Sequence, residues 1–187
     1  MGRKLPKVLS DDEQQRLLNQ FNLRYDSGLR NLCIVRVILD AGLRAGEAVA
    51  IKPDHLDMRT CKLMIRDGKG AKDRTLWISS GLRDLIGQWL ERRCESPWLF
   101  PTRSGSKLLT RYLRQMIKTY AEKADISELE KVSPHTLRHT FATDLYRETK
   151  NIRLVQKSLG HSDLSTTMIY THIVDDELEE ALKSFRG

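Results

Sequence analysis

Histidine, arginine and tyrosine side chains are concentrated in one stretch of the chain, residues 133–170. His135 and Arg138 lie three positions apart, and His161 follows in a Gly-His-Ser turn. Tyr170 comes nine residues after His161. A spacing of three places two side chains on one face of a helix, and an arginine can bind a phosphate through two parallel hydrogen bonds. Together these residue types favour phosphate chemistry with tyrosine as the nucleophile.

Simpler interpretations stay open for each residue taken alone. His135 could be a capping or surface histidine, and Tyr170 could be a core or rim residue. His135 and His139 have a metal-ligand spacing of four, but no acidic residue lies between them as in the HExxH motif. The guanidinium of Arg138 would also repel a cation. We therefore expect neither a metal nor a cofactor. The segment 160–164 lacks the second glycine of a nucleophile elbow.

Composition points to a polyanionic partner. The chain has 32 Lys+Arg against 25 Asp+Glu and a net charge of +7, which favours nucleic acid first and an anionic membrane surface second. A soluble protein that happens to be basic is the other interpretation. No apolar run is long enough to span a membrane, and no secretory signal is expected. Three widely spaced cysteines without metal-ligand spacing fit a reducing cytosol.

Periodicity and capping residues predict a mainly α (α+β) fold with a small three-stranded antiparallel sheet. The expected strands span 55–58, 61–66 and 74–78, with a Gly-rich hairpin loop at 67–73. Helices are expected after Ser10 and Asp26, across 42–51, around 82–90, across 103–123, after Ser133 and after Asn151, in a short segment that carries Tyr170, and across 175–185. Residues 103–123 combine a cationic and an apolar face. The cationic face could be a solvated surface or could lie against phosphates.

Several motifs occur in a fixed order along the chain. They are GLR at 42–44 followed by Glu47, GKGAKDR at 68–74, HTLRH at 135–139, LGHSD at 159–163 and TTMIYTH at 166–172. This ordered set resembles the catalytic domain of the tyrosine recombinase (phage integrase) family, and most nearly its Xer-like members. The similarity runs from about residue 8 to residue 174. Each piece alone is weak, whereas the ordered combination is highly specific.

The resemblance implies a set of site residues. The family site holds two arginines, a lysine, a histidine, a further histidine or tryptophan, and a tyrosine. Matched by position, these are Arg44, Arg138, Lys69, His135, His161 and Tyr170, with Glu47 in a supporting acidic position. We also expect DNA contacts from the basic residues of the hairpin and of the 103–123 stretch, namely Lys72, Arg74, Arg103, Lys107, Arg111, Arg114 and Lys118. His139 and His172 are expected to be structural.

The resemblance also implies a mechanism. Tyr170 would attack a phosphodiester, form a 3′-phosphotyrosyl link and release a 5′-hydroxyl, and covalent storage of the bond would make ATP unnecessary. The implied roles are charge neutralisation for Arg44 and Arg138, a phosphate hydrogen bond for His161, protonation of the leaving oxygen for Lys69, and proton transfer at the tyrosine for His135. The alternatives are a type IB topoisomerase and a DNA-binding regulator without turnover. The complete set of six residues argues against the regulator.

The expected organisation is one catalytic domain over 1–187, with a basic arm at 1–9 and a tail helix at 174–187. Family members carry a separate helical domain ahead of this one, and only 43 residues precede Arg44, so we expect that domain to be absent. The tail could dock onto a neighbouring subunit or pack on its own domain. We expect a monomer alone and a tetramer on double-stranded DNA, in the cytoplasm and associated with the nucleoid.

Overall fold

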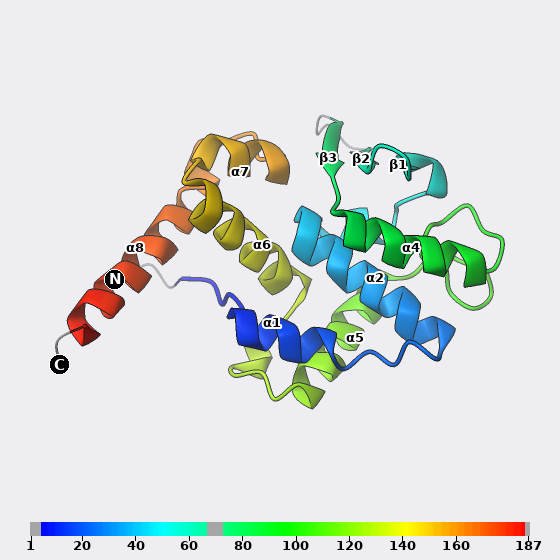
Figure 1. Cartoon of the computed structure of the whole chain (residues 1–187), viewed down its shortest axis with the longest axis horizontal. Coiled ribbons are helices and arrows are strands. Elements are labelled where there is room, and N and C mark those ends of the chain that lie inside the picture. The colour runs from blue at the N-terminus through cyan, green and yellow to red at the C-terminus, as the bar shows by residue number, and fades with distance from the viewer. Residues whose placement is uncertain (1–4, 67–72, 186–187) are drawn as a thin grey trace.

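The chain folds into helices that pack around one another and against a small sheet (Figure 1). The computed structural model describes residues 5–66 and 73–185, with only some of the side chains after residue 175. The helices are α1 (Asp11–Leu18), α2 (Asp26–Ala41), α3 (Ala45–Ala48), α4 (Ser80–Arg92), α5 (Thr110–Lys123), α6 (Pro134–Thr149), α7 (Ile152–Leu159) and α8 (Ile169–Ser184). Short 3₁₀ turns cover Pro53–His55, Leu129–Lys131 and Leu164–Thr166. The mainly α prediction is confirmed.

The predicted three-stranded sheet is present. Strands β1 (Leu56–Asp57), β2 (Lys62–Ile65) and β3 (Arg74–Trp77) pair antiparallel in the order β1-β2-β3. Leu56, Leu63 and Leu76 pair across the three strands and are all buried, so one face of the sheet packs on the core. Side chains alternate between the two faces of a strand, and Trp77 on the other face is 63% exposed.

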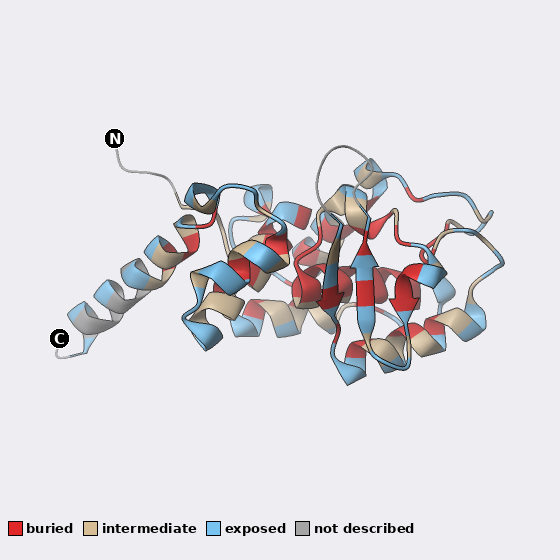
Figure 2. Cartoon of the chain, turned by 90° about the horizontal axis from the view of Figure 1, so that it is seen from above, coloured by how far each residue is buried: buried red, intermediate tan, exposed pale blue. Residues whose placement is uncertain are grey.

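Helix α2 lies at the centre of the main core, between α4 and α6 (Figure 1). Figure 2 shows the buried residues concentrated along these helices and beneath the sheet. A second, smaller cluster joins α6, α7 and α8 through Ala142, Val155, Leu159, Tyr170 and Ile173. Tyr170 is therefore part of a core as well as of a candidate site.

Two glycines turn the chain from a helix end directly into a motif. Gly42 ends α2 and Gly160 ends α7, each with a φ of +66°. Glycine adopts this left-handed conformation more readily than other residues, although Lys150 also adopts it at the end of α6. Arg44 follows two residues after Gly42, and His161 follows Gly160 at once. The predicted C-caps at both positions are confirmed. They place the two motif residues Arg44 and His161 in the same region.

Some predicted boundaries were wrong. Residues 103–123 do not form one helix, because Gly105 has a φ of +80° and the chain makes a turn closed by a bridge between Pro101 and Lys107. The helix predicted across 42–51 is limited to α3.

The C-terminal prediction also needs correction. Tyr170 does not lie in a short helix of its own, since α8 runs without a break from Ile169 to Ser184. No glycine or proline interrupts that span. Helix α8 projects away from the rest of the molecule (Figure 1). Residues 5–9, expected as an arm, lie against α6, where the Leu9 amide donates to Thr140 Oγ1 at 2.9 Å. Within the described ranges, no helix is long and apolar enough to cross a membrane.

Candidate active site

The carboxylate of Glu47 lies at the centre of an arginine cluster. Its side chain is 8% exposed. Arg74 Nη1 and Nη2 donate to its two oxygens, each at 2.8 Å. The backbone amide of Arg44 donates at 2.7 Å and its Nη1 at 3.1 Å. Burial alone would raise the pKa of Glu47, but hydrogen bonds from Arg74 and the Arg44 amide outweigh it and hold the pKa below its ordinary value. Glu47 is therefore an anion that organises the surrounding cations.

Arg138, from the first turns of α6, is buried and joins two helix ends. Its Nη1 donates to Gly42 O at 2.6 Å, and its Nη2 donates to Leu159 O at 2.8 Å. Glu47 Oε2 lies 3.8 Å from Nη1. Burial, and next the charge of Arg44, lower the pKa of Arg138 to about 10, which leaves it charged at neutral pH. The fold thus fixes a buried guanidinium at the point where the ends of α2 and α7 meet.

His161 is held between Arg138 and Thr167. Arg138 Nη2 lies 3.2 Å from His161 Nε2, and His161 Nδ1 lies 3.0 Å from Thr167 Oγ1. A guanidinium only donates, so Nε2 is the acceptor and Nδ1 carries the hydrogen. Burial, followed by the charge of Arg138, lowers the pKa of His161 to about 4. The imidazole is therefore neutral and its tautomer is set by its two partners.

Tyr170 is the second residue of α8 and is 1% exposed. Its hydroxyl lies 3.0 Å from His139 Nδ1. Burial raises the pKa of Tyr170 above its ordinary value, and the charge of Arg138 opposes this rise. The pKa of His139 falls to about 4 through burial, then through His135 and Arg138. His139, expected to be structural, was missed as a site residue, because sequence spacing does not show which of two nearby histidines faces α8.

The structure brings four of the six predicted catalytic residues together: Arg44, Arg138, His161 and Tyr170 share a network of contacts and charges. His135 is exposed in the first turn of α6, and no described residue hydrogen-bonds to its side chain. Lys69, together with Lys72 of the predicted DNA-binding set, lies outside the described residues.

Arg74 occupies a different place from the one expected. The sequence predicted that Arg74 contacts DNA, yet its side chain is only 10% exposed. Besides the two bonds to Glu47, its Nε donates to Ser158 O at 3.0 Å. The GKGAKDR motif contains Arg74, but nothing in the motif indicates that the guanidinium turns inward. Arg74 supports the arginine cluster from strand β3.

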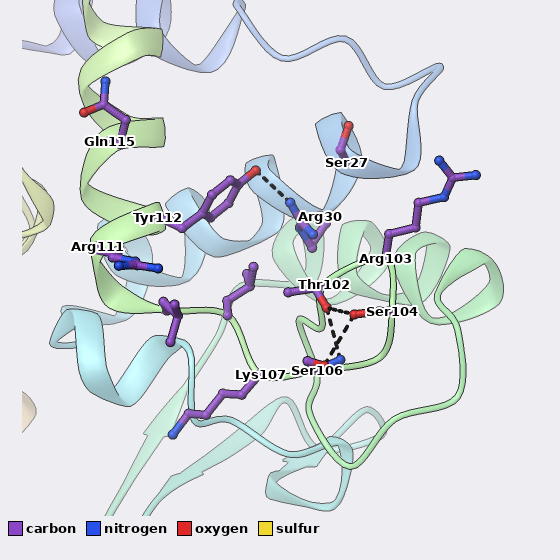
Figure 3. A pocket seen from close by; sticks show the side chains of 12 residues that line it. Ser27, Arg30, Thr102, Arg103, Ser104, Ser106, Lys107, Arg111, Tyr112 and Gln115 are labelled. Carbon is purple, nitrogen blue, oxygen red and sulfur yellow. Dashed lines mark hydrogen bonds between the residues drawn. The ribbon is translucent and has the colours of Figure 1, made fainter.

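The basic residues of the 103–118 segment lie on the surface. Arg111, Arg114 and Lys118 are exposed on α5, opposite its buried face. Arg103 and Lys107 lie on the preceding loop. Three of the five, Arg103, Lys107 and Arg111, line a cavity of about 930 Å³ between this loop, the start of α2 and the start of α5 (Figure 3).

Comparisons with known proteins bear on the family and the fold of the chain. The model described as "Phage integrase family" matches residues 7–177. Tyrosine recombinase XerA of Thermococcus kodakarensis is 40% identical over 183 residues, which cover 96% of this chain and 62% of the relative. The chain thus spans about three fifths of the length of that curated relative.

Comparison with solved structures shows the same relationship at the level of the fold. A crystal structure of XerA recombinase matches with a TM-score of 0.85 at 34% identity, covering 100% of this chain and 67% of that one. XerH site-specific recombinase, bound to a palindromic difH substrate in a post-cleavage complex, matches with a TM-score of 0.85 at 30% identity and covers 98% of this chain and 54% of that one. The fold and the resemblance are confirmed.

Proposed function

The chain belongs to the phage integrase family, and on that premise we propose that it is a tyrosine recombinase that cleaves and rejoins DNA strands at a specific site. One observation carries the proposal. The buried guanidinium of Arg138 hydrogen-bonds to His161 and its charge also acts on the phenol of Tyr170. A nucleophile and phosphate-binding groups therefore meet at one point.

We assign the binding of the scissile phosphate to Arg44, Arg138 and His161. Arg44 is 39% exposed, so its guanidinium can reach an incoming phosphate. Arg138 has five N–H donors, and three are used on Gly42, Leu159 and His161. Its remaining donors can stabilise the negative charge that builds on the non-bridging oxygens.

The reaction is a transesterification at phosphorus. The oxygen of Tyr170 bonds to phosphorus, and the bond from phosphorus to the 5′-oxygen breaks. The 3′-phosphate is then linked to the tyrosine, and the bond energy is kept for rejoining. Lys69 is proposed to protonate the leaving 5′-oxygen. His135 is exposed at the start of α6, where we propose that it meets the DNA phosphate and assists proton transfer.

The hydroxyl of Tyr170 must become accessible to DNA. With 1% of the residue exposed, its oxygen is covered by protein. We propose that the first turn of α8 shifts when DNA binds. Helix α8 packs on α6, and much of its length extends beyond the body of the molecule (Figure 1).

Double-stranded DNA is the proposed partner, bound in part by the exposed cations of α5 and of the loop before it, namely Arg103, Lys107, Arg111, Arg114 and Lys118. Arg74 is assigned to the arginine cluster instead. Since strand exchange needs several active sites at once, we propose a tetramer on DNA that forms from monomers. Action on chromosomal DNA would place the protein at the nucleoid in the cytoplasm.

The test is the capture of a covalent protein–DNA adduct. Nicked duplexes with a randomised core would be incubated with the protein, and adducts would be separated by denaturing electrophoresis and sequenced. We expect wild type to form adducts on a restricted set of sequences and Tyr170→Phe to form none. Tyr25→Phe, at a residue that is 66% exposed, is the matched control and should react like wild type.

Absence of a wild-type adduct, or equal adduct from Tyr170→Phe, would overturn the proposal. Binding without an adduct would favour the regulator. Adduct formation with relaxation of supercoiled DNA, but without strand exchange, would favour the topoisomerase.

A further inference from the structure

The hydroxyl of Tyr170 has one hydrogen-bond partner among residues 5–66 and 73–185, the Nδ1 atom of His139 at 3.0 Å. The two rings are tilted by 50° with centroids 5.8 Å apart. His139 follows Arg138 directly in α6, while Tyr170 comes from α8. One helix therefore supplies both the phosphate-binding guanidinium and the group that contacts the nucleophile.

Burial determines the direction of this hydrogen bond. The phenolic proton lies inside the protein, where a donor without an acceptor is strongly unfavourable. If Nδ1 carried a hydrogen, no other described residue would accept the phenolic proton. The Tyr170 hydroxyl therefore donates to Nδ1, and the hydrogen of the imidazole lies on Nε2. His139 is half-buried, so Nε2–H can reach water.

We propose that His139 is the catalytic acceptor of the nucleophile: its Nδ1 orients the Tyr170 hydroxyl and receives the phenolic proton as the oxygen bonds to phosphorus. The inference rests on the proposed function. In the balanced step, the O–P bond forms and the bond to the 5′-oxygen breaks. The phenolic proton moves to Nδ1 and yields an imidazolium, while a separate acid protonates the 5′-oxygen.

The timing of the transfer follows from the two acidities. Burial raises the pKa of Tyr170 above its ordinary value and lowers the pKa of His139 to about 4. Transfer of the phenolic proton to His139 before attack would therefore be strongly unfavourable. Once the phenolic oxygen bonds to phosphorus, its proton becomes far more acidic and a weak base is sufficient. The proton transfer therefore accompanies the attack.

This role differs from the one that the resemblance implies for His135. The His135 side chain is exposed, and no described residue hydrogen-bonds to it. His139 contacts the reacting oxygen directly. His135 remains available to the phosphate at the start of α6.

The hydrogen bond can be tested on the DNA-free protein by nitrogen NMR of the histidine rings, with the His139 signals assigned by their loss in His139→Asn. We expect His139 to show the Nε2–H tautomer. The Nδ1 signal should shift in Tyr170→Phe, which removes the donor, and should not shift in Tyr25→Phe. An Nδ1 signal that is the same in Tyr170→Phe as in wild type would overturn the proposal.

The catalytic part is tested by single-turnover adduct formation. In His139→Asn the side-chain oxygen can accept at the position of Nδ1 but cannot take up a proton. In His139→Leu neither function is left. We expect a loss of about 100-fold for Asn and about 10-fold more for Leu. The wild-type rate should fall at acid pH as His139 and His161, each with a pKa of about 4, become protonated, and the fall should be shallower in the Asn variant, in which His161 alone of the two still titrates.

The outcomes separate the two proposals. Wild-type rates in His139→Leu, with the variant folded by circular dichroism, would overturn the role of His139. Equal losses in both variants with the wild-type pH profile would indicate packing alone and would also overturn it. Absence of an adduct from wild type would instead overturn the proposed function, and the NMR measurement would still decide the hydrogen bond.

Discussion

Arg74 and Glu47 form a bidentate ion pair in which both N–O distances are 2.8 Å. The pair links the start of strand β3 to helix α3. Arg74 Nε also donates to Ser158 O in α7. One guanidinium therefore holds three elements together.

Glu47→Gln should destabilise the fold. The change keeps the size of the side chain but removes the charge that faces Arg44, Arg74 and Arg138. Breaking a buried ion pair on one side costs about 3–5 kcal/mol. We expect a loss of about 3 kcal/mol in the free energy of unfolding, measured by urea denaturation with an unchanged m-value. Glu91→Gln, at an exposed position on α4, is the control. A change of less than about 0.5 kcal/mol would show that Glu47 does not organise the cluster.

Stability should fall as the pH falls from about 7 to about 5. The pKa values of His139 and His161 are about 4 in the folded protein, below the ordinary value of 6.5. The unfolded chain therefore binds more protons in this window, and protonation favours unfolding. The contribution of each neutral histidine is fully present above pH 6.5 and is lost toward pH 4.

The measurement is the midpoint of urea denaturation at about pH 7 and at about pH 5. His161→Gln should reduce the difference between the midpoints, because one of the three histidines with lowered pKa values, His55, His139 and His161, no longer titrates. His172→Gln, at an exposed residue, should leave the difference unchanged. A midpoint that is the same at both pH values in wild type would contradict the assignment of His139 and His161 as half-buried, neutral histidines.

The sequence predicted the elements of the site better than their contacts. Gly42 and Gly160 were found as helix ends from residue type alone, because glycine adopts the left-handed conformation most easily. The contact of His139 with Tyr170 depends on how α6 is rotated against α8, which spacing within α6 does not determine. The inward turn of Arg74 likewise depends on Glu47, which is 27 positions away. Pairings across elements are set by packing, and one sequence does not display them.

Arg138→Lys should abolish most cleavage while keeping the charge. The guanidinium reaches Gly42 O and Leu159 O together, whereas an ammonium is a point donor without a planar fork. Adduct formation should fall by about 100-fold or more, as expected for the loss of a donor to developing charge. Arg36→Lys, in the α2 pair with Asp40, is the control. Near-normal cleavage by Arg138→Lys would count against a bidentate role.

Thr167→Val should weaken the phosphate contact made by His161. Thr167 is fully buried, and its hydroxyl meets Nδ1 at 3.0 Å. A hydroxyl can accept from Nδ1–H or donate to Nδ1, so it supports both tautomers. His161 accepts from Arg138 in the free protein and must donate from Nε2 to bind a phosphate oxygen.

Valine has a similar shape but allows neither bond, so adduct formation should fall by about 10-fold in single-turnover assays, consistent with a loss of about 1.4 kcal/mol. Thr167→Ser keeps the hydroxyl and should restore most of the rate. Equal rates for the Ser and Val variants would mean that the hydroxyl has no part in orienting His161.

The exposed cations of α5 should bind DNA through its phosphates. Arg111→Gln and Arg114→Gln each remove one positive charge from this surface. Each phosphate contact releases counterions and contributes about 0.9 to the slope of log affinity against log salt concentration. Each variant should therefore weaken binding to a fluorescent random-sequence duplex at low salt and reduce the slope by about one. Arg59→Gln, on the exposed turn between β1 and β2, removes the same charge from another surface and should leave the slope as in wild type. If all three variants lower the affinity equally, the effect is one of net charge, and the α5 surface is not the binding face.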